Sequence, residues 1–362
     1  MCGIVALVGS REAAPQLLEG LRQLEYRGYD SAGIATVNRE GLLTCLRAKG
    51  KLVNLTARFD EQGAPGQCGI GHTRWATHGK PEECNAHPHR SCDGGVAVVQ
   101  NGIIENHRSL RDELQAAGVV FQSETDTEVI PHLVAAELKR LQADGGQLGG
   151  PLLLQAVQAV LPQLQGAYAL AVIWQEAPGA LVVARRAAPL LIGLGEGEFL
   201  CASDTPALAG FTRTILPMQD GEVALLSPLG VELYDSQGQR QQRMPSVLSG
   251  TDHVADKRHF RHYMLKEIHE QPETAELWVA RHLPQGLAPE TPVALPFDDA
   301  FYAGLQRIEI LACGTSRHAA LVGAYLLEQY AGIPTAVYYA SEFRYAPPPL
   351  APNTLTIGVT QS

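Results

Sequence analysis

The sequence predicts two domains of different fold class: an α+β domain, followed by the start of an α/β domain with a parallel sheet. Helical patterns are grouped between residues 106 and 164 and short strand patterns fill residues 166–235, so strands and helices do not alternate there. Residues 236–259 are rich in Gln, Ser, Arg and Asp and lack apolar periodicity, which is typical of a linker. Beyond them, strand and helix patterns alternate as in a parallel sheet.

Length and composition agree with this division. The chain has 362 residues, enough for two domains of roughly 150 residues each. Its 45% hydrophobic and 18% charged content is that of a folded globular protein rather than a disordered one. We place the first domain at residues 2–240, the linker at 241–260 and the second domain at 261–362.

Apolar spacing predicts the elements of the first domain. Residues 3–8 (GIVALV) are a continuous apolar run typical of a buried strand, and a helix at 11–25 places four leucines on one face. Strands at about 33–38 and 42–47 are joined by Asn-Arg-Glu-Gly, which suits a hairpin turn. The other strands are expected at 68–75, 95–100, 167–174, 180–185, 189–194, 198–203, 221–227 and 231–235, and the other helices at 106–117, 127–141 and 151–164.

The second domain is expected to contain helices at about 261–282 and 316–331 and strands at 307–312, 335–339 and 354–360. The pattern stops at Ser362, directly after a strand, without the helix that would complete the unit. We therefore expect the chain to be a truncated form of a longer protein.

Charge and apolar length exclude several classes of function. The formal net charge is -10 and there is no Lys/Arg cluster, so nucleic acid is not expected as a partner. No apolar run approaches the roughly 18 residues that span a bilayer. The apolar opening Cys2–Val8 has no basic residue before it, unlike a signal peptide. The seven cysteines are odd in number and form no C-x-x-C pair, which indicates reduced thiols in a cytoplasmic protein.

Cys2 is a candidate nucleophile because of its place in the chain. It directly follows Met1, and its small side chain favours removal of that methionine, which leaves a thiol and a free α-amine on one residue. Such an amine has a pKa of roughly 7.7–8 and can act as the base for the thiol. A buried cysteine at the start of a core strand is the competing interpretation, and for a Met-Cys pair alone it is the better one.

A glutamine-hydrolysing site would need three partners for this thiol, and the sequence offers a candidate for each. Arg74 ends a strand, where a guanidinium can clamp a carboxylate through two parallel bonds. Asn101 and Gly102 end the next strand and can converge on an oxyanion through an amide and a backbone N–H. Asp126 lies at a helix start and could bind an ammonium group. Singly, these residues are also explained by a surface ion pair, a hairpin turn and a helix cap.

Longer motifs then identify a family by resemblance. They are CGIV at 2–5, YRGYDSAG at 26–33, HTRWATHG at 72–79, NAHPH at 85–89, NGIIEN at 101–106, SETDTE at 123–128, ASD at 202–204, RHYM at 261–264, EI at 267–268, EQP at 270–272, ILACGTS at 310–316 and ASEFRY at 340–345. In this order, and over essentially the whole chain, they resemble the glucosamine-6-phosphate synthases, or glutamine–fructose-6-phosphate aminotransferases.

The resemblance implies both a fold and an activity. The first domain would be a layered αββα N-terminal-nucleophile glutaminase, and the second would be the start of a sugar isomerase (SIS) domain. The complete enzyme would transfer ammonia from L-glutamine to fructose 6-phosphate, giving glucosamine 6-phosphate and glutamate, with no metal or other cofactor. It would be a cytoplasmic homodimer.

The resemblance also assigns roles to single residues. Cys2 would be the nucleophile, and His78 would contact the substrate instead of acting as the catalytic base. Asn101 and Gly102 would form the oxyanion hole. The glutamine-binding residues would be Arg74, Thr77, His78 and Asp126, with Trp75 where the family gates the passage of ammonia.

A phosphosugar site is expected in the second domain. The strand at 307–312 runs into Cys-Gly-Thr-Ser, where hydroxyls and backbone N–H groups at a helix N-terminus suit a phosphate. Thr-Gln-Ser at 360–362 takes the equivalent place after a later strand. A simple helix cap explains either turn alone, but two equivalent turns in a parallel sheet favour a phosphosugar site. Position 360 is threonine in this chain, whereas the family usually has serine there; both residues carry a hydroxyl. The family's isomerase acid–base residues lie beyond Ser362, so we expect glutamine hydrolysis without aminosugar synthesis. The candidate phosphate-binding residues are Thr315, Ser316, Thr360, Gln361 and Ser362.

A zinc site competes for one stretch of the first domain. Cys84, His87, His89 and Cys92 place four zinc-type ligands within nine residues. However, His87 and His89 belong to the NAHPH motif, which is not a metal site in the family that the chain resembles. We therefore expect no metal.

Two further functions are weighed against the leading one. Another cysteine-first amidotransferase, such as amidophosphoribosyltransferase, would carry a phosphoribosyl-binding domain in place of the segments ILACGTS and ASEFRY. A regulator that only binds a sugar phosphate would have no use for the set of Cys2, Arg74, Asn101 and Asp126.

Overall fold

The computed structural model of the chain describes residues 2–75, 79–248, 260–283 and 297–360. It divides into two compact units, Met1–Tyr263 and Met264–Ser362.

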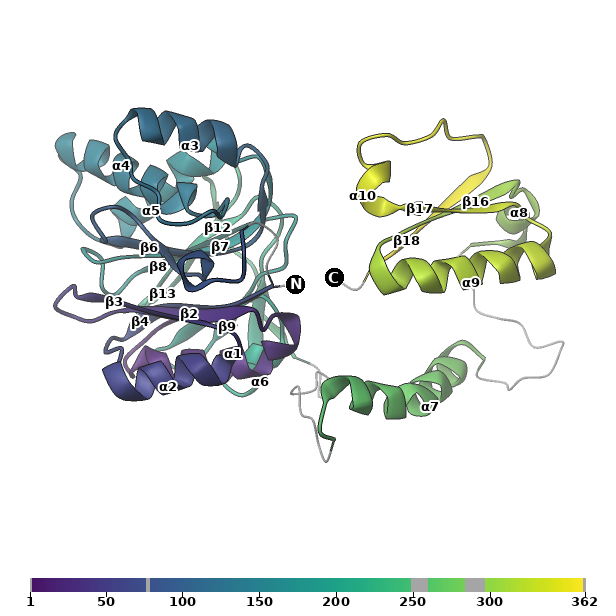
Figure 1. Cartoon of the computed structure of the whole chain (residues 1–362), viewed down its shortest axis with the longest axis horizontal. Helices are drawn as coiled ribbons and strands as arrows, with labels where there is room; N and C mark the ends of the chain where they lie inside the picture. The colour runs from purple at the N-terminus through teal and green to yellow at the C-terminus, as the bar shows by residue number, and fades with distance from the viewer. Residues whose placement is uncertain (1, 76–78, 249–259, 284–296, 361–362) are drawn as a thin grey trace. The chain divides into compact units, whose positions relative to one another are not determined.

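The first unit contains two antiparallel sheets, shown in purple to teal in Figure 1. The eight-stranded sheet has the order β15 (Ser246–Val247), β11 (Thr214–Pro217), β9 (Leu191–Leu194), β10 (Phe199–Ala202), β1 (Gly3–Val8), β4 (Cys68–Arg74), β2 (Ser31–Val37), β3 (Leu43–Lys49). The seven-stranded sheet has the order β14 (Arg240–Gln241), β13 (Gly230–Tyr234), β12 (Val223–Ser227), β8 (Leu181–Arg186), β7 (Gly166–Trp174), β6 (Val96–Ile104), β5 (His89–Arg90).

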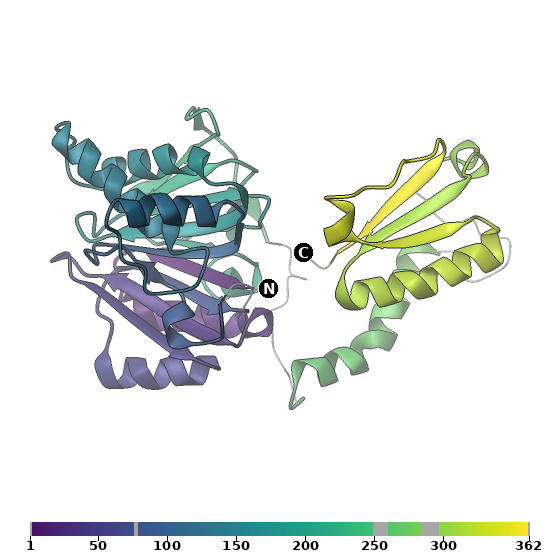
Figure 2. The ribbon, with the colours of Figure 1, turned by 45° about the horizontal axis from the view of Figure 1, so that its top comes forward.

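Helices cover the outer face of each sheet, so that four layers result (Figures 1 and 2). The eight-stranded sheet is covered by α1 (Ala13–Gln23), α2 (Leu52–Gln62) and the short α6 (Pro206–Ala209). The seven-stranded sheet is covered by α3 (His107–Ala116), α4 (Val129–Ala143) and α5 (Gly150–Val160). Short 3-10 helices occur at η1 (Glu25–Arg27), η2 (Glu83–Asn85) and η3 (Leu161–Gln163).

Strand β1 shows how the sequence builds these layers. Its side chains alternate between two cores, as successive residues of a strand must. Ile4 and Ala6 face the core between the sheets, where they join residues of β6 and β7. Val5 and Leu7 face the other way, into the core formed with α1. All six residues of β1 are buried, and the expected αββα fold is confirmed.

Several local features were not evident from sequence. Helix α2 has β-branched residues at Val53 and Thr56, which lower its helix propensity, so its two buried leucines gave a weak signal. Strand β11 has only four residues and ends in proline. The first part of the expected linker 241–260 belongs to the sheets, because β15 pairs with β11. Leu248, 6% exposed, packs into the same core as α1.

The second unit is built on a three-stranded parallel sheet with the order β17 (Thr335–Tyr339), β16 (Arg307–Ala312), β18 (Thr354–Val359). All three strands lie where the sequence predicts them. Its helices are α7 (Tyr263–His282), α8 (Asp299–Ala303), α9 (Gly314–Ala331) and α10 (Ala340–Phe343). Ala320 of α9 packs on Ile308 and Ile310 of β16, so this helix covers the sheet.

Across the described part of the chain, every helix is too short or too polar to cross a membrane.

Candidate active site

Cys2 stands at the start of β1, in the middle of the eight-stranded sheet. β1 pairs with β10 on one side and with β4 on the other, where Gly3 is opposite Thr73. Ser203 holds the beginning of this strand through two hydrogen bonds to Ile4. Its hydroxyl accepts from the Ile4 N–H at 3.0 Å, and its own N–H donates to the Ile4 carbonyl at 3.1 Å. The candidate nucleophile thus directly precedes a central strand whose N-terminal end is held in place by hydrogen bonds.

The thiol of Cys2 contacts the backbone that follows β4. The N–H of Trp75 donates to Cys2 Sγ at 3.3 Å, and the thiol lies 3.5 Å from the Trp75 carbonyl. Burial raises the pKa of this thiol, against the opposing effects of the Trp75 N–H and of the charges on Arg74 and Arg27. The thiol is therefore protonated near neutral pH and needs a base before it can attack.

The Cys2 carbonyl is held by two side chains. Arg27 Nε donates to it at 3.1 Å and Asn101 Nδ2 at 3.2 Å. Arg27 is itself held by Asp204, at 2.5 Å, and Asp204 also accepts from the Tyr26 hydroxyl at 2.6 Å. Reasoning from sequence gave Arg27 and Asp204 no role, although both lie in quoted motifs, YRGYDSAG and ASD.

Asn101 and Gly102 lie within β6, not at its end as the apolar run suggested. The ladder continues through them, with Asn101 opposite Ala169 and Gly102 opposite Tyr168 of β7. Gly102 has φ +110, and a Cβ there would lie 2.1 Å from the Ala167 carbonyl oxygen, so no other residue fits. The Asn101 side chain donates to the Cys2 carbonyl, and the next residue, Gly102, is exposed. Both expected oxyanion donors therefore lie on one segment of β6, which contacts Cys2.

Arg74 is buried at the end of β4, 3% exposed. Its guanidinium donates to the carbonyls of Gly79 at 3.4 Å and Lys80 at 3.3 Å. Burial lowers the pKa of Arg74, against the opposing effects of charge on Cys2 and Asp126. The backbone of the next residue, Trp75, contacts the Cys2 thiol, so this position suits a guanidinium that receives a ligand carboxylate through two parallel bonds.

Asp126 is 4% exposed and precedes α4 by three residues, so it lies before the helix and does not begin it. Its Oδ2 accepts a hydrogen bond from Ile104 N–H at 2.7 Å, which ties it to the end of β6. The loop around it is fastened by Glu128, which accepts from the N–H groups of Gln122 and Ser123, each at 2.7 Å. A buried carboxylate is thus fixed at the end of β6, the strand that carries Asn101 and Gly102.

The remaining expected glutamine contacts are only partly described. The Trp75 side chain is 44% exposed and its ring meets the edge of Tyr29, with centroids 5.5 Å apart. Its contact with Cys2 is made by the backbone. Thr77 and His78 lie outside the described residues.

The four candidate zinc ligands are divided between interior and surface. His87 and His89 are buried, whereas Cys84 and Cys92 are exposed. The His87 ring lies against His72, with centroids 4.2 Å apart, and His89 Nε2 is 2.9 Å from Thr125 Oγ1. Among the residues that the structure describes, no three His, Cys, Asp or Glu side chains are grouped so as to hold a metal ion.

In the second unit, Thr315 and Ser316 lie in the first turn of α9, which begins at Gly314, two residues earlier than expected. Gly314 has φ +57, a conformation that suits glycine where the strand turns into the helix. β18 is the parallel neighbour of β16, so Thr360 follows at the same edge of the sheet. Gln361 and Ser362 lie outside the described residues.

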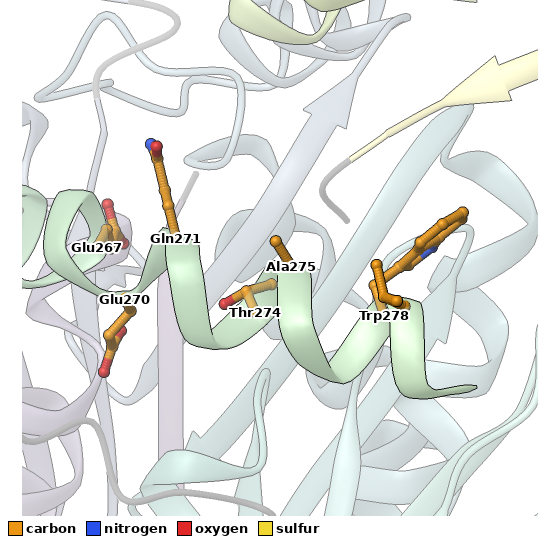
Figure 3. Close-up of a pocket in the computed structure, with 7 residues that line it drawn as sticks. Glu267, Glu270, Gln271, Thr274, Ala275 and Trp278 are labelled. Carbon is orange, nitrogen blue, oxygen red and sulfur yellow. The ribbon is translucent and has the colours of Figure 1, made fainter. Parts of the chain in front are cut away.

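A separate hollow of about 520 Å³ lies along α7 (Figure 3). Its described lining residues all come from this one helix and include Glu267, Glu270 and Trp278. None of the described residues that are expected to bind glutamine or a sugar phosphate lines it.

Comparison with known proteins places this geometry in a family. A glutamine amidotransferase domain matches residues 72–210, and an SIS domain matches residues 302–362. The glutamine–fructose-6-phosphate aminotransferase (isomerizing) of Thermosynechococcus vestitus is 56% identical over 365 residues, across 100% of this chain. The chain belongs to this aminotransferase family.

Other relatives agree. Proteins of the same name from a Nostoc species and from Symbiobacterium thermophilum are 54% and 45% identical, each across 100% of this chain. The chain spans 57% of the length of the Thermosynechococcus and Nostoc aminotransferases and 58% of the Symbiobacterium one.

Solved structures support the fold. The glutamine phosphoribosylpyrophosphate amidotransferase of B. subtilis has a TM-score of 0.57 and 22% identity, covering 93% of this chain and 65% of that one. At this identity the likeness shows the shared amidotransferase fold alone. The SIS match and the aminotransferase relatives do not favour the phosphoribosyl enzyme or a purely binding regulator as the function.

Proposed function

We propose that this aminotransferase-family chain hydrolyses L-glutamine to glutamate and ammonia at Cys2. The observation that carries the proposal is a convergence of four residues from distant parts of the sequence. Asn101 donates to the Cys2 carbonyl, and the Cys2 thiol contacts the backbone of Trp75, which directly follows Arg74. Asp126 is bonded to the N–H of Ile104, on the strand that carries Asn101. A nucleophile, an oxyanion donor, a cation and an anion are the parts that the reaction requires.

The mechanism begins once Met1 has been removed. The free α-amine of Cys2 accepts the thiol proton, and Sγ attacks the side-chain amide carbon of glutamine. The negative charge that forms on the amide oxygen is stabilised by Asn101 Nδ2 and the Gly102 N–H. The C–N bond then breaks, the protonated amine supplies the proton to the departing ammonia, and a thioester remains. Water attacks the thioester and releases glutamate and the thiol.

Recognition of the amino-acid end follows from the buried charges. The Arg74 guanidinium binds the α-carboxylate, and Asp126 binds the α-ammonium through the carboxylate oxygen that Ile104 does not hold. Thr77 and His78 are proposed as further contacts, supported by the HTRWATHG motif, and Trp75 as the gate for ammonia.

We expect Arg74→Lys to lower kcat/KM for glutamine by roughly 10–100-fold, since it loses the planar fork that matches a carboxylate. Asp126→Asn should give a comparable loss. It keeps an oxygen for the Ile104 N–H, so the loop stays in place while the charge that binds ammonium is removed. Steady-state kinetics of both variants, with thermal unfolding as a control for folding, check this. A loss smaller than twofold in either variant contradicts the assigned roles.

Asn101→Ala should act differently, since an oxyanion donor works mainly in the transition state. We expect kcat to fall by roughly 10²–10³-fold with little change in KM. The measurement is a full saturation curve for glutamate release. A variant with raised KM and unchanged kcat would show that Asn101 binds the ground state instead.

In the second unit we infer a site for the phosphate of fructose 6-phosphate, to which the ammonia would be transferred. Thr315 and Ser316 offer hydroxyls and N–H groups at the N-terminus of α9, and Thr360 follows the neighbouring strand β18. Gln361 and Ser362 are proposed as further contacts from the sequence. The SIS match over residues 302–362 and the printed substrate in the relatives' names support this. By the same family argument the complete protein is a homodimer. Seven free cysteines, among them Cys84 and Cys313 on the surface, support a cytoplasmic location.

The direct test is an assay of the purified chain beginning at Cys2. Incubation with L-glutamine should release glutamate and ammonia in equal amounts, whereas asparagine, one methylene shorter, should be a poor substrate. A second arm adds fructose 6-phosphate and follows aminosugar formation. Absence of glutamate release from a folded chain whose mass confirms Cys2 as the first residue would reject the proposal.

A further inference from the structure

His72 lies directly beside the expected oxyanion donor. It stands in β4, opposite Ile4 of β1, and is 0% exposed. Its Nε2 is 3.0 Å from Asn101 Oδ1. Motif reasoning singled out the arginine two residues later and gave His72 no role.

The contacts of Asn101 determine which way its side-chain amide faces. One end of a carboxamide donates hydrogen bonds and the other accepts them. The Nδ2 end donates to the Cys2 carbonyl at 3.2 Å, so the Oδ1 end faces His72. The opposite orientation would place two oxygens against each other at Cys2. Because Oδ1 can only accept, His72 must donate to it from Nε2.

The rest of the histidine ring favours the same assignment. With the proton on Nε2, Nδ1 is bare, and this buried atom has no hydrogen-bond partner among the described residues. A second proton there would place a positive charge on a fully buried ring. Burial accordingly lowers the pKa of His72 to about 3, against the raising effect of the Asn101 bond. The ring is therefore neutral at neutral pH and present as a single tautomer.

Neighbouring groups also fix the plane of the ring. His87 stacks on His72 at 4.2 Å and an angle of 28°. His87 Nδ1 in turn receives the N–H of Gln100, the residue before Asn101, at 3.4 Å. His87 therefore supports both partners of the His72–Asn101 hydrogen bond: it stacks on the ring of His72, and it holds the backbone next to Asn101.

We propose that His72 is a positioning residue of the oxyanion hole: its Nε2–H holds the Asn101 carboxamide in the orientation that aims Nδ2 at the reacting carbonyl. This rests on the proposed hydrolysis of glutamine at Cys2. Without the histidine donor, the amide can rotate or flip, and the transition state loses a donor while glutamine binding through Arg74 and Asp126 is unaffected.

Two matched substitutions separate positioning from packing. His72→Gln carries an NH₂ group at the reach of Nε2, whereas His72→Asn carries the same group at the reach of Nδ1, away from Asn101. We expect His72→Asn to lower kcat by roughly 10–100-fold, below the full loss of an oxyanion donor, with KM within about twofold. His72→Gln should keep kcat within about threefold of wild type. Equal losses in the two variants would overturn the proposal.

A double-mutant cycle adds a second criterion. In an Asn101→Ala background His72 has nothing left to orient, so His72→Asn should lower kcat no further than about twofold. Multiplied losses in the double variant would show that His72 acts elsewhere. His132→Asn, which replaces another buried histidine of the unit, reports the effect of such a change on the thermal unfolding midpoint.

The third readout needs no variant and stands even when the substituted chains fail to fold. Nitrogen chemical shifts of ¹⁵N-histidine-labelled wild-type protein distinguish the two neutral tautomers. We expect His72 to remain neutral, with the proton on Nε2, down to at least about pH 5. A proton on Nδ1, or titration near the ordinary histidine pKa of roughly 6.5, would overturn the proposal. Absence of glutamate release by the wild-type chain would instead reject the proposed function and leave the tautomer result valid.

Discussion

Replacing Cys2 by alanine is expected to lower the rate of glutamate release by roughly 10³-fold or more, to the background rate. The reason is that no other group can form the thioester. Cys2→Ser should be nearly as inactive, because a hydroxyl is a much weaker nucleophile than a thiolate in a site built around sulfur. The fold should survive both changes, because the only hydrogen bonds of the thiol to residues that the structure describes are with the Trp75 backbone. Steady-state assays with equal amounts of folded protein, checked by thermal unfolding, measure the effect.

Labelling provides the control for this prediction. A glutamine analogue with an electrophilic group should modify Cys2 alone, although Cys84 and Cys92 are more exposed. Buried thiols are not expected to react, because burial raises the pKa of Cys68 to about 12. Cys84→Ala and Cys92→Ala should keep full activity and full labelling. A modified peptide that contains Cys84 or Cys92, or a Cys2→Ala variant with wild-type turnover, would refute the nucleophile assignment.

Blocking the N-terminus should have an effect nearly as large. When Met1 or a tag remains, the nitrogen of Cys2 is an amide and cannot accept a proton. The thiol has its pKa raised by burial, so it then stays protonated and does not attack. We expect an N-terminally extended chain to release glutamate at background rate, while the same tag at the C-terminus leaves activity intact.

A cleavable extension makes the comparison within one sample. A protease site placed so that cleavage exposes Cys2 should switch activity on, and the mass of the product should correlate with the rate. Full activity of the uncleaved protein would reject the N-terminal base while leaving the family membership unchanged.

Much of the fold could be predicted because the decisive patterns are local. The run GIVALV and the leucine face of α1 report a strand and a helix without knowledge of their partners. What could not be predicted depends on distant contacts. α2 is stabilised mainly by packing of Leu52 and Leu55 into the core of the first unit, and β15 is a strand only because β11 lies beside it.

The site divides in the same way. Cys2, Arg74 and Asp126 could be proposed from residue type and the reaction's needs, helped by the resemblance. The support around them could not, since Arg27 and Asp204 are 177 residues apart in sequence. His72 has no signal of its own, because a histidine inside a strand is ordinary until its neighbour Asn101 is seen.

The setting of β1 has a consequence for how the enzyme loses activity. Chain ends are usually the first parts of a protein to fray. Here the strand that directly follows Cys2 lies inside the first unit: β1 is between β10 and β4, fully buried, and its Ile4 is hydrogen-bonded to Ser203. Local opening therefore cannot detach the reactive residue while the rest stays folded. As temperature or denaturant is raised, glutamine hydrolysis should therefore be lost in the same transition as the structure of the first unit.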